Sequence, residues 1–296
     1  MSDMLHAKQR AQAVRNTMTD HQSMTLAQQL ASSFPLQQVA TPGGVVSYRR
    51  AGAGQAMVLL HGIGSASGSW LSQLQGLQAT HTVLAWDAPG YGSSDVLRLE
   101  KPEPRHYGAR VWDWLDVLGL DGRPVTLVGH SLGALMAASA TTLQPDRVAR
   151  LVLLSPAQGY GRADVALRET KLRDRLNALQ AHGPRGLAEL RGRAMVSSGA
   201  DAGLVEYIKT IMAQIRPDGY TQAAHMLAGA HLATELQDVQ CPILVASGAA
   251  DTITPKDGCE NLARERGAPY RTLGPVGHAC ALEAAATVNQ LLINME

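Results

Sequence analysis

The sequence is poor in cysteine, in excess charge and in long apolar runs, and each shortage argues against a class of protein. Its three cysteines, Cys241, Cys259 and Cys280, have no C-x-x-C or Cys/His metal spacing, so we interpret them as reduced thiols. The formal net charge is +1, which gives no large field to attract nucleic acid or an anionic membrane. No apolar run reaches membrane-spanning length, and no basic-then-apolar signal peptide opens the chain. We therefore expect a cytoplasmic protein with neither nucleic acid nor membrane as a partner.

Apolar residues are abundant, and they alternate between strand-like and helix-like patterns. Of the 296 residues, 45% are hydrophobic, which suits one α/β core with an insertion or two small domains. Near-continuous apolar runs predict buried strands, and apolar residues at helical spacing predict helices. The expected strands are 45–50, 56–60, 81–86 and 148–155, with helices between them at 68–77 and 105–118, and the run 125–138 is expected to begin as a strand and end as a helix on the two sides of residues 129–133. This alternation is typical of a doubly wound parallel sheet, whose strand C-terminal ends meet at one edge.

The alternation stops at residue 157 and resumes near residue 242. Between these points the pattern predicts only helices, with breaks at glycine and proline. The expected helices are 163–180, 184–197, 202–215 and 220–231, and the chain then continues with a strand at 242–248, a helix at 256–266, a short strand at 270–273 and a last helix at 282–293. We therefore divide the chain into a partly helical N-terminal extension (1–35, with a short helix over 20–31), an α/β core (36–156 and 237–296) and a helical insertion (157–236).

A G-x-S-x-G motif, formed by residues 129–133, joins an expected strand to an expected helix. A serine in so sharp a turn needs small neighbours, and Gly129 and Gly133 supply that room. The turn exposes the Ser131 hydroxyl, and the following helix directs its N-terminal amides and the positive end of its dipole at the same point. A serine can also simply fill a tight turn, but the strand before it and the helix after it favour a nucleophile.

Two further polar residues follow expected strands and suit the chemistry of an activated serine. His278 lies between the strand at 270–273 and the last helix, and Asp251 directly follows the strand at 242–248. A serine hydroxyl is a weak nucleophile unless a base takes its proton, and a carboxylate can fix the tautomer of that base and stabilise its imidazolium. Structural alternatives stay open, with His278 as a hydrogen-bonded core histidine and Asp251 as the cap of the next helix.

These residues belong to five short motifs, each at an expected strand end: HGIG at 61–64, DAPGYGSS at 87–94, GHSLG at 129–133, GAAD at 248–251 and GH at 277–278. In this order they make the chain resemble the α/β-hydrolase superfamily from about residue 45 to the C-terminus. The resemblance implies a mostly parallel eight-stranded sheet flanked by helices, with the insertion as a four-helix cap over the active site. It also implies Ser131 as nucleophile, His278 as base and Asp251 as the acid that orients the base. The other acid position of this superfamily follows the strand at 148–155, where this chain has Pro156, and this favours Asp251.

An oxyanion hole is expected beside the nucleophile. The developing alkoxide must sit near Ser131 and meet two preset donors. The N–H of Leu132 is one, at the start of the elbow helix, and the N–H of Ile63 is the other, in the loop after the strand at 56–60. Both donors belong to the backbone, so the side chains at these positions are only loosely constrained.

The machinery suits acyl transfer to water through an acyl-enzyme, with neither a metal nor an organic cofactor. Dehalogenases and epoxide hydrolases that resemble this chain carry Asp at the position of Ser131. Hydrolases of meta-cleavage products, which break carbon–carbon bonds, usually have Met in the elbow and Trp after the base, where this chain has Leu132 and Ala279. We therefore expect an esterase or lactonase acting on a small apolar ester-like substrate, and we leave open carbon–carbon hydrolysis, a non-catalytic ligand-binding role and a homodimer.

Other polar residues near these motifs have structural interpretations. His61 is expected to organise its loop by hydrogen bonds, and His130 to point away from the nucleophile. The Asp87 carboxylate is expected to accept hydrogen bonds from loop amides, and Cys280 to be a small buried filler. Several residues of the insertion are candidates for either the substrate pocket or helix packing, and the sequence does not separate the two: Met195, Tyr220, His225, Met226 and His231.

Overall fold

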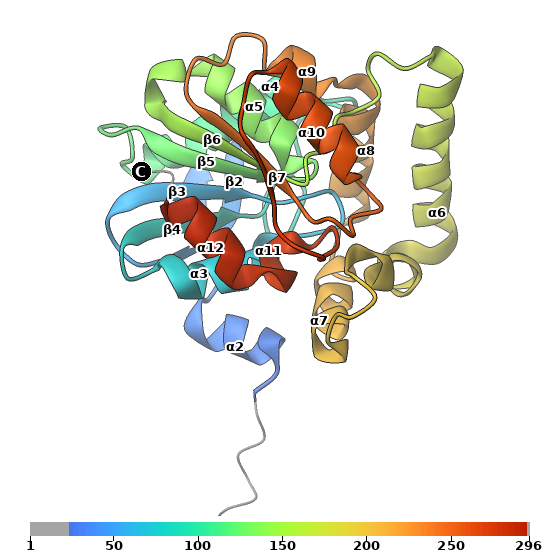
Figure 1. Ribbon diagram of the computed structural model, residues 1–296, viewed down its shortest axis with the longest axis horizontal. Helices are drawn as coiled ribbons and strands as arrows, with labels where there is room; N and C mark the ends of the chain where they lie inside the picture. Colours follow the sequence, from blue (N-terminus) through green and yellow to red (C-terminus); the bar gives the residue numbers. More distant parts are fainter. Residues whose placement is uncertain (1–23, 295–296) are drawn as a thin grey trace, which may run out of the picture.

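Eight strands form one sheet in the order β1-β2-β4-β3-β5-β6-β7-β8 in the computed structural model, which describes residues 24–294 (Figure 1). The strand β2 pairs antiparallel with both β1 and β4, and all other pairs are parallel. The strands are β1 (Gln37–Thr41), β2 (Gly44–Ala51), β3 (Gln55–Leu60), β4 (His81–Trp86), β5 (Val125–His130), β6 (Val148–Leu154), β7 (Ile243–Ser247) and β8 (Tyr270–Thr272). The expected mostly parallel eight-stranded sheet is confirmed.

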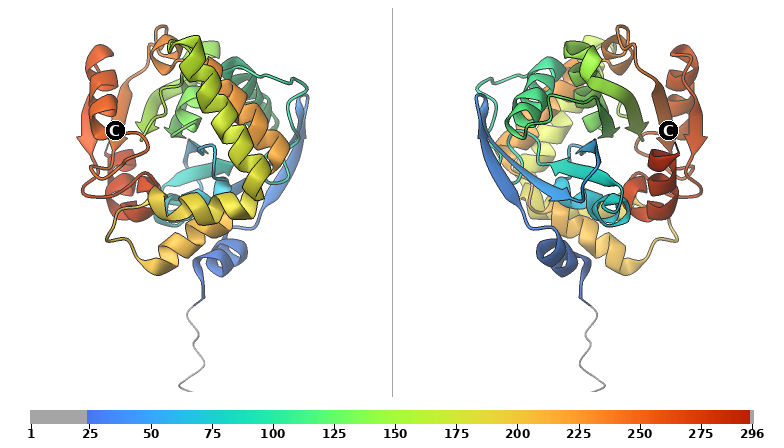
Figure 2. Two further views of the ribbon diagram at one scale, coloured as in Figure 1. Left: turned by 90° about the vertical axis from the view of Figure 1, so that its right-hand side faces the viewer. Right: turned by 90° about the vertical axis from the view of Figure 1, so that its left-hand side faces the viewer.

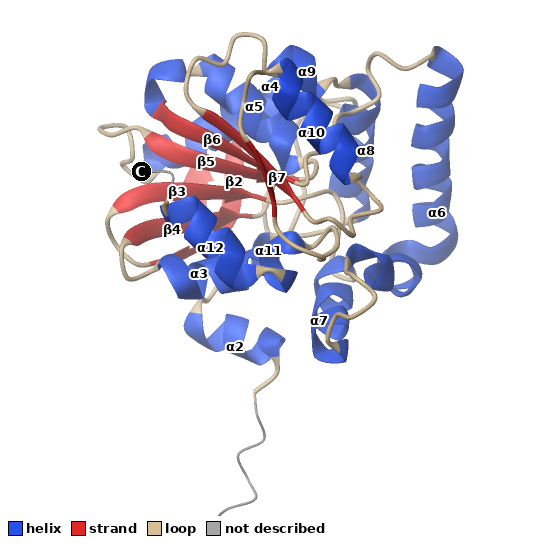
Figure 3. Ribbon diagram, in the orientation of Figure 1, coloured by secondary structure: helices blue, strands red, loops and turns tan. Residues whose placement is uncertain are grey.

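Helices cover both faces of this sheet (Figure 3). One face packs on α4 (Pro104–Val117), α5 (Gly133–Leu143) and α10 (Lys256–Glu265). The other packs on the 3-10 turn η1 (Ser67–Trp70), α3 (Leu71–Leu77), α11 (Cys280–Glu283) and α12 (Ala285–Ile293). A further 3-10 turn, η2 (Pro145–Arg147), leads into β6.

The apolar runs of the sequence become central strands because both of their faces are covered. In β3, Met57 and Leu59 enter the core on one side of the sheet, while Val58 and Leu60 enter the core on the other. Successive side chains of a strand point to opposite faces, so only an uninterrupted apolar run can fill both cores. The same burial on both faces explains the apolar runs of β4, β5 and β6. Because these strands pair in parallel with β3 or with each other, their C-terminal ends lie at one edge of the sheet.

The helical insertion lies between β6 and β7. It consists of α6 (Val165–Arg191), the 3-10 turn η3 (Gly192–Met195), α7 (Ala202–Met212), α8 (Pro217–Gly229) and α9 (Leu232–Glu235), and its described residues 157–236 contain no strand. The first two expected helices are joined in α6, which bends at Gly183, where φ is +61°. Pro184 follows this glycine and starts the second arm of the helix. Seen from the insertion side (Figure 2, left), α6 and α8 run next to each other in front of the sheet.

The described part of the N-terminal extension holds the helix α2 (Leu26–Ser33), which Thr25 caps. Leu30 and Phe34 are buried in the same core as Tyr207 and Ile211 of α7, so this segment packs against both the core and the insertion. The helix expected at 20–31 begins later than predicted within the described residues, and its positions 20–23 lie outside them. Between residues 24 and 294, no helix combines the length and apolar character needed to cross a bilayer.

Candidate active site

The register of the parallel strands gathers the motif-bearing loops at one edge of the sheet. Leu60 at the end of β3 pairs with Gly129 of β5, and His130 at the end of β5 pairs with Leu154 at the end of β6. Leu154 pairs in turn with Ala246 of β7. The loops that carry the predicted nucleophile, acid and oxyanion donors therefore leave the sheet side by side.

Ser131 occupies a strained turn between β5 and α5. Its φ is +54°, a left-handed conformation that side chains other than glycine rarely adopt, and its N–H donates to Leu154 O at 3.0 Å. A Cβ on Gly129 would lie 2.5 Å from Gly133 O, and a Cβ on Gly133 would lie 2.1 Å from Leu60 O. The turn is thus possible only with glycine on both sides of the serine, as the motif predicted.

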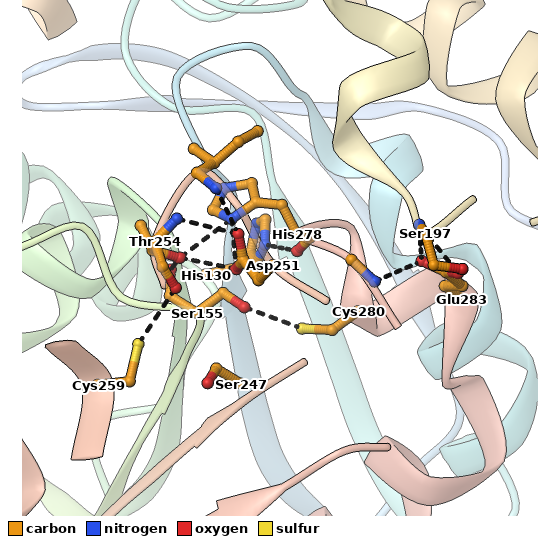
Figure 4. A network of polar contacts seen from close by, with 12 residues as sticks. His130, Ser155, Ser197, Ser247, Asp251, Thr254, Cys259, His278, Cys280 and Glu283 are labelled. Carbon is orange, nitrogen blue, oxygen red and sulfur yellow. Dashed lines mark hydrogen bonds and ion pairs between the residues drawn. The ribbon is translucent and has the colours of Figure 1, made fainter. Parts of the chain in front are cut away.

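The predicted base and acid are in contact. His278 Nδ1 donates to Asp251 Oδ2 at 2.9 Å, and both side chains are almost completely buried (Figure 4). Asp251 Oδ1 accepts from the N–H groups of Ile253 and Thr254, each at 2.9 Å. The alternative, an acid that caps the next helix, is wrong, because α10 begins after Pro255 without a side-chain cap, and Asp251 binds loop amides and the histidine.

The hydrogen bonds of Asp251 keep its carboxyl ionised. Burial raises its pKa, but the hydrogen bond and charge of His278, together with the hydrogen bonds of Thr254, outweigh burial and hold the pKa well below its usual value. An ionised carboxylate accepts the proton on Nδ1 of His278 and so leaves Nε2 unprotonated in the neutral ring. The base therefore has the tautomer that proton abstraction requires.

Thr254 is a site residue that the sequence analysis missed. Its Oγ1 lies 2.8 Å from Asp251 Oδ2, 3.1 Å from His278 Nδ1 and 3.1 Å from Ser155 O (Figure 4). The hydroxyl thus ties the acid and the base to the end of β6. A threonine three residues after an aspartate, in a turn, is a weak local signal for such a contact.

His130 lies beside the base, where its ring makes structural contacts. Its ring centroid is 4.8 Å from that of His278, its Nε2 donates to His278 O at 2.8 Å, and it lines the same cavity as Ser131. Burial, with the neighbouring His278, lowers the pKa of His130 to about 3, so the ring is neutral near pH 7. A neutral ring with its proton on Nε2 is the form that donates to a carbonyl.

The two predicted oxyanion donors face the same cavity as Ser131. Gly62 O accepts from His61 Nδ1 at 2.8 Å and from Ser65 N at 3.2 Å, so the N–H of Ile63, on the opposite side of that peptide, points away from both. Tyr91 donates to Ile63 O at 2.8 Å and holds the next peptide. Within residues 24–294, the N–H groups of Ile63 and Leu132 have no hydrogen-bond partner.

The loops after β3 and β4 are held by His61 and Asp87 as expected. His61 Nε2 accepts from Ala88 N at 3.0 Å, and burial lowers the pKa of the ring, which keeps it neutral. Asp87 accepts from Ser67 N at 2.7 Å and from Ser47 Oγ at 2.8 Å. Both side chains stabilise the loops and do not line the cavity.

A cavity of about 490 Å³ lies between the strand ends and the helical insertion. Ser131, His278, Ile63 and Leu132 all line it. A hydrogen bond between Ser131 Oγ and His278 is not among the contacts of residues 24–294, so the structure brings the two side chains to one cavity without joining them. The insertion contributes mainly apolar side chains to the walls, among them Met195, Tyr220, Leu187, Ile208, Met212 and Leu227.

The cysteines show no sign of reactivity. Cys280 is buried with its Sγ 3.6 Å from Ser155 Oγ, and burial raises the pKa of its thiol to about 12. Cys259 lines the cavity, and burial raises the pKa of its thiol to about 11. Thiols with such pKa values are protonated near pH 7 and are poor nucleophiles. No group of three or more metal-ligating side chains of the His, Cys, Asp and Glu types occurs between residues 24 and 294.

The profile of the alpha/beta hydrolase family matches residues 57–291. The (E)-2-((N-methylformamido)methylene)succinate hydrolase of Acinetobacter baylyi is 28% identical over 211 residues, which make up 69% of this chain and 75% of that protein. The dihydrolipoyllysine-residue acetyltransferase component of the acetoin cleaving system of Cupriavidus necator is 30% identical over 273 residues, 86% of this chain and 67% of that protein.

Among solved structures, a malate-bound thermophilic esterase from Thermogutta terrifontis superimposes with a TM-score of 0.78. The match covers 88% of this chain and 97% of the esterase, at 23% sequence identity. At 23% identity, the similarity shows a shared fold and no more. Reaction and substrate must be argued from the site itself.

Proposed function

The chain belongs to the alpha/beta hydrolase family, and on this premise we propose that it is a serine hydrolase that cleaves a small carboxylic ester or lactone through an acyl-enzyme. One observation carries the proposal. Ser131, on a strained turn with φ +54°, faces the same cavity as His278, whose Nδ1 is held by Asp251 at 2.9 Å. A nucleophile, a base and an orienting carboxylate are the minimum set for acyl transfer by a serine.

In the proposed mechanism, Ser131 Oγ attacks the substrate carbonyl while His278 Nε2 takes its proton. Asp251 stabilises the imidazolium that forms, and the imidazolium then protonates the leaving alcohol oxygen. Water attacks the remaining acyl-enzyme with His278 again as base, and the acid product leaves. In a lactone the alcohol stays attached to the acyl group, so one hydroxy acid is released.

The proposed oxyanion hole stabilises the tetrahedral intermediate. The N–H groups of Ile63 and Leu132 are free to donate and face the cavity beside the nucleophile. Because both belong to the backbone, they need no reorganisation as charge develops on the substrate oxygen. Loss of one such donor is expected to raise the barrier by roughly 3–4 kcal/mol.

The helical insertion is proposed as a cap that selects the substrate. Its apolar side chains form much of the wall opposite Ser131, so most of the bound molecule is expected to be apolar. Walls of this kind exclude water from the reacting carbonyl and strengthen the electrostatic contacts to it. The Acinetobacter relative is named as a hydrolase, which supports the same reaction class for this chain.

Labelling with a fluorophosphonate probe tests the proposal. We expect covalent labelling of the folded protein and none in Ser131→Ala, with tandem mass spectrometry placing the phosphonate on Ser131. A wild-type protein that resists labelling would leave the non-catalytic ligand-binding role as the better account. Labelling that persists in Ser131→Ala would overturn the assignment of the nucleophile.

A second assay separates ester from carbon–carbon hydrolysis. We expect turnover of short 4-nitrophenyl esters to exceed that of a vinylogous diketone acid, since Leu132 and Ala279 stand where carbon–carbon hydrolases of this fold usually have Met and Trp. The diketone acid is followed by loss of its absorbance and the ester by release of nitrophenolate. Efficient turnover of the diketone acid alone would refute the preference for esters.

A further inference from the structure

Two arginines line the otherwise apolar wall of the cavity. Arg175 and Arg191 both belong to α6 of the helical insertion, and both are partly buried. Of residues 24–294, no aspartate, glutamate or lysine lines this cavity. Arg175 and Arg191 are therefore the only permanently charged residues among the described ones that line the cavity with Ser131.

Neither guanidinium has a counter-charge. Within residues 24–294, neither guanidinium forms an ion pair or a hydrogen bond. Arg147 and Arg216, which are also partly buried, do have partners, since Arg147 pairs with Asp116 at 2.6 Å and Arg216 donates to Ser94 O at 2.7 Å. In the described part of the chain, Arg168 is likewise partly buried without a side-chain partner, but it does not line the cavity.

The bend of α6 brings both arginines to one cavity. They are separated by sixteen positions, which in a straight helix would place them about 24 Å apart. The break at Gly183 separates the helix into two arms, and Arg175 lies on the first arm and Arg191 at the end of the second. Two residues of the same charge, one from each arm of the helix, therefore line one cavity.

Unpaired charge beside an apolar cavity is unfavourable, and a bound anion offsets that cost. A guanidinium binds a carboxylate through short, charge-assisted hydrogen bonds, which are stronger where water is excluded. We propose that the substrate carries a carboxylate in addition to the scissile ester, and that Arg175 and Arg191 bind this carboxylate while the ester carbonyl lies at Ser131. The inference rests on the proposed function and refines its substrate class from an apolar ester to an apolar ester acid.

A pair of esters that differ only in the remote charge tests this proposal. Mono-4-nitrophenyl adipate and 4-nitrophenyl hexanoate have acyl chains of equal length, and the first ends in a carboxylate where the second ends in a methyl group. We expect kcat/KM to favour the adipate, with the preference decreasing as salt rises. After subtraction of uncatalysed hydrolysis, the ratio of the two values is the measure.

Substitution of the arginines tests whether Arg175 and Arg191 cause the preference for the adipate. In Arg175→Gln or Arg191→Gln we expect the adipate-to-hexanoate ratio to fall about tenfold, mainly through KM for the adipate, with a larger fall in the double variant. Arg173→Gln is the matched control, because Arg173 is on the same helix, is exposed and bonds only to Thr170. Its ratio should match that of the wild type.

Other outcomes would overturn the proposal. If the ratio is unchanged in the double variant, or falls equally in Arg173→Gln, the arginines do not recognise the carboxylate. Arg191 also lies in the last turn of α6, where a cation favours helix stability, and a purely structural role would lower the melting temperature and slow both esters alike.

A binding assay separates this inference from the proposed function. Monomethyl adipate is titrated calorimetrically into the Ser131→Ala protein, with Ser131→Ala/Arg175→Gln/Arg191→Gln as the comparison. Binding that is lost in the triple variant supports carboxylate recognition, even if fluorophosphonate labelling of the wild type fails and the hydrolase proposal falls. Equal affinity in both proteins, or no binding to either, would contradict it.

Discussion

His130 Nε2 donates a hydrogen bond to the main-chain carbonyl of His278 across 2.8 Å. The residue that precedes the nucleophile thus holds the backbone of the base, although the two are far apart in sequence. The tilted rings, with centroids 4.8 Å apart, add a packing contact to this link. The positions of Ser131 and His278 are therefore linked through His130, on which the proton transfer of the proposed mechanism would depend.

Replacing His130 with alanine is expected to reduce kcat by roughly ten- to a hundredfold, because a displaced base cannot meet the serine proton in line. His130→Gln keeps an amide donor and should retain more activity. Because burial lowers the pKa of His130 to about 3, its protonation should not contribute to the kcat/KM profile between pH 5 and 9. Measured profiles of the wild type and His130→Gln should share the same apparent pKa values.

A wild-type level of kcat in His130→Ala would show that the base is held by Asp251 alone. A new inflection above pH 5 in the wild type that disappears with His130 would contradict a permanently neutral ring.

The sequence predicted those parts of the fold that depend on residues within one short segment. Buried strands such as β3 and β5 need uninterrupted apolar runs, and the turn at Ser131 needs Gly129 and Gly133, so short segments carry the signal. The strand β1 was not predicted, because it is an exposed, polar edge strand whose pairing with β2 is antiparallel. Its conformation depends on its neighbour more than on its own residues.

The contacts that the sequence did not reveal join segments far apart in the chain. The direction of His130, the hydroxyl of Thr254 between three elements, and the bend of α6 at Gly183 follow from packing. The two unpaired arginines of α6 have ordinary helical neighbours in sequence and become distinctive only when the cavity encloses them. The predicted triad, by contrast, could be proposed early, because each member lies in a loop that follows a strand.

Thr254→Val removes the hydroxyl that contacts Asp251, His278 and Ser155 O. We expect a loss of about 1–2 kcal/mol in the free energy of unfolding and a decrease in kcat, because buried acceptors lose a partner and the acid–base pair loosens. Thr254→Ser keeps the hydroxyl and should recover most of kcat. Chemical denaturation and steady-state kinetics on the three proteins give both values.

If valine and serine at this position behave alike, the contribution of Thr254 lies in its methyl group and not in its hydrogen bonds. The pH profile supplies an independent check. Loss of the Thr254 side-chain hydrogen bond removes one of the influences that lower the pKa of Asp251, while the bond from the backbone N–H remains. On the acid side of the profile, activity should therefore begin to fall at a higher pH in the valine variant than in the wild type or the serine variant.

Asp251→Asn is expected to reduce kcat by roughly 10³–10⁴-fold, because an amide favours the wrong tautomer of His278. Its effect on stability should depend on pH. The pKa of Asp251 is lower in the folded protein than in the unfolded chain, so the ionised carboxylate stabilises the fold above about pH 4. That contribution is lost as pH falls through the lowered folded-state pKa. The difference in unfolding free energy between wild type and variant should therefore shrink below pH 4, as urea denaturation at several pH values would reveal.

A difference that stays constant down to pH 2.5, or grows, would contradict the lowered pKa of Asp251.

Glu283 fastens the loop of the base to the helical insertion. Its carboxylate accepts from Gly277 N at 2.8 Å and from Ser197 N at 3.1 Å, and it also contacts the Ser197 hydroxyl (Figure 4). Beside it, Ala279 N donates to Met195 O at 2.6 Å. The segment that leads from η3 to α7 is thus bound on both sides of His278, so movement of the insertion would be transmitted to the base.

Glu283→Ala should therefore loosen the insertion and lower kcat/KM about tenfold, a loss in the range of one or two buried charge-assisted hydrogen bonds. Hydrogen exchange at residues 195–212 should become faster in this variant. Gly277→Ala tests the same contact from the other side, because its new Cβ would lie 2.5 Å from Val196 C and push the two segments apart. Glu260→Ala, which removes an exposed pair with Lys256, is the control. If exchange in 195–212 is unchanged in both Glu283→Ala and Gly277→Ala while kcat/KM falls, Glu283 acts on the His278 loop alone, and the insertion is not coupled to the base.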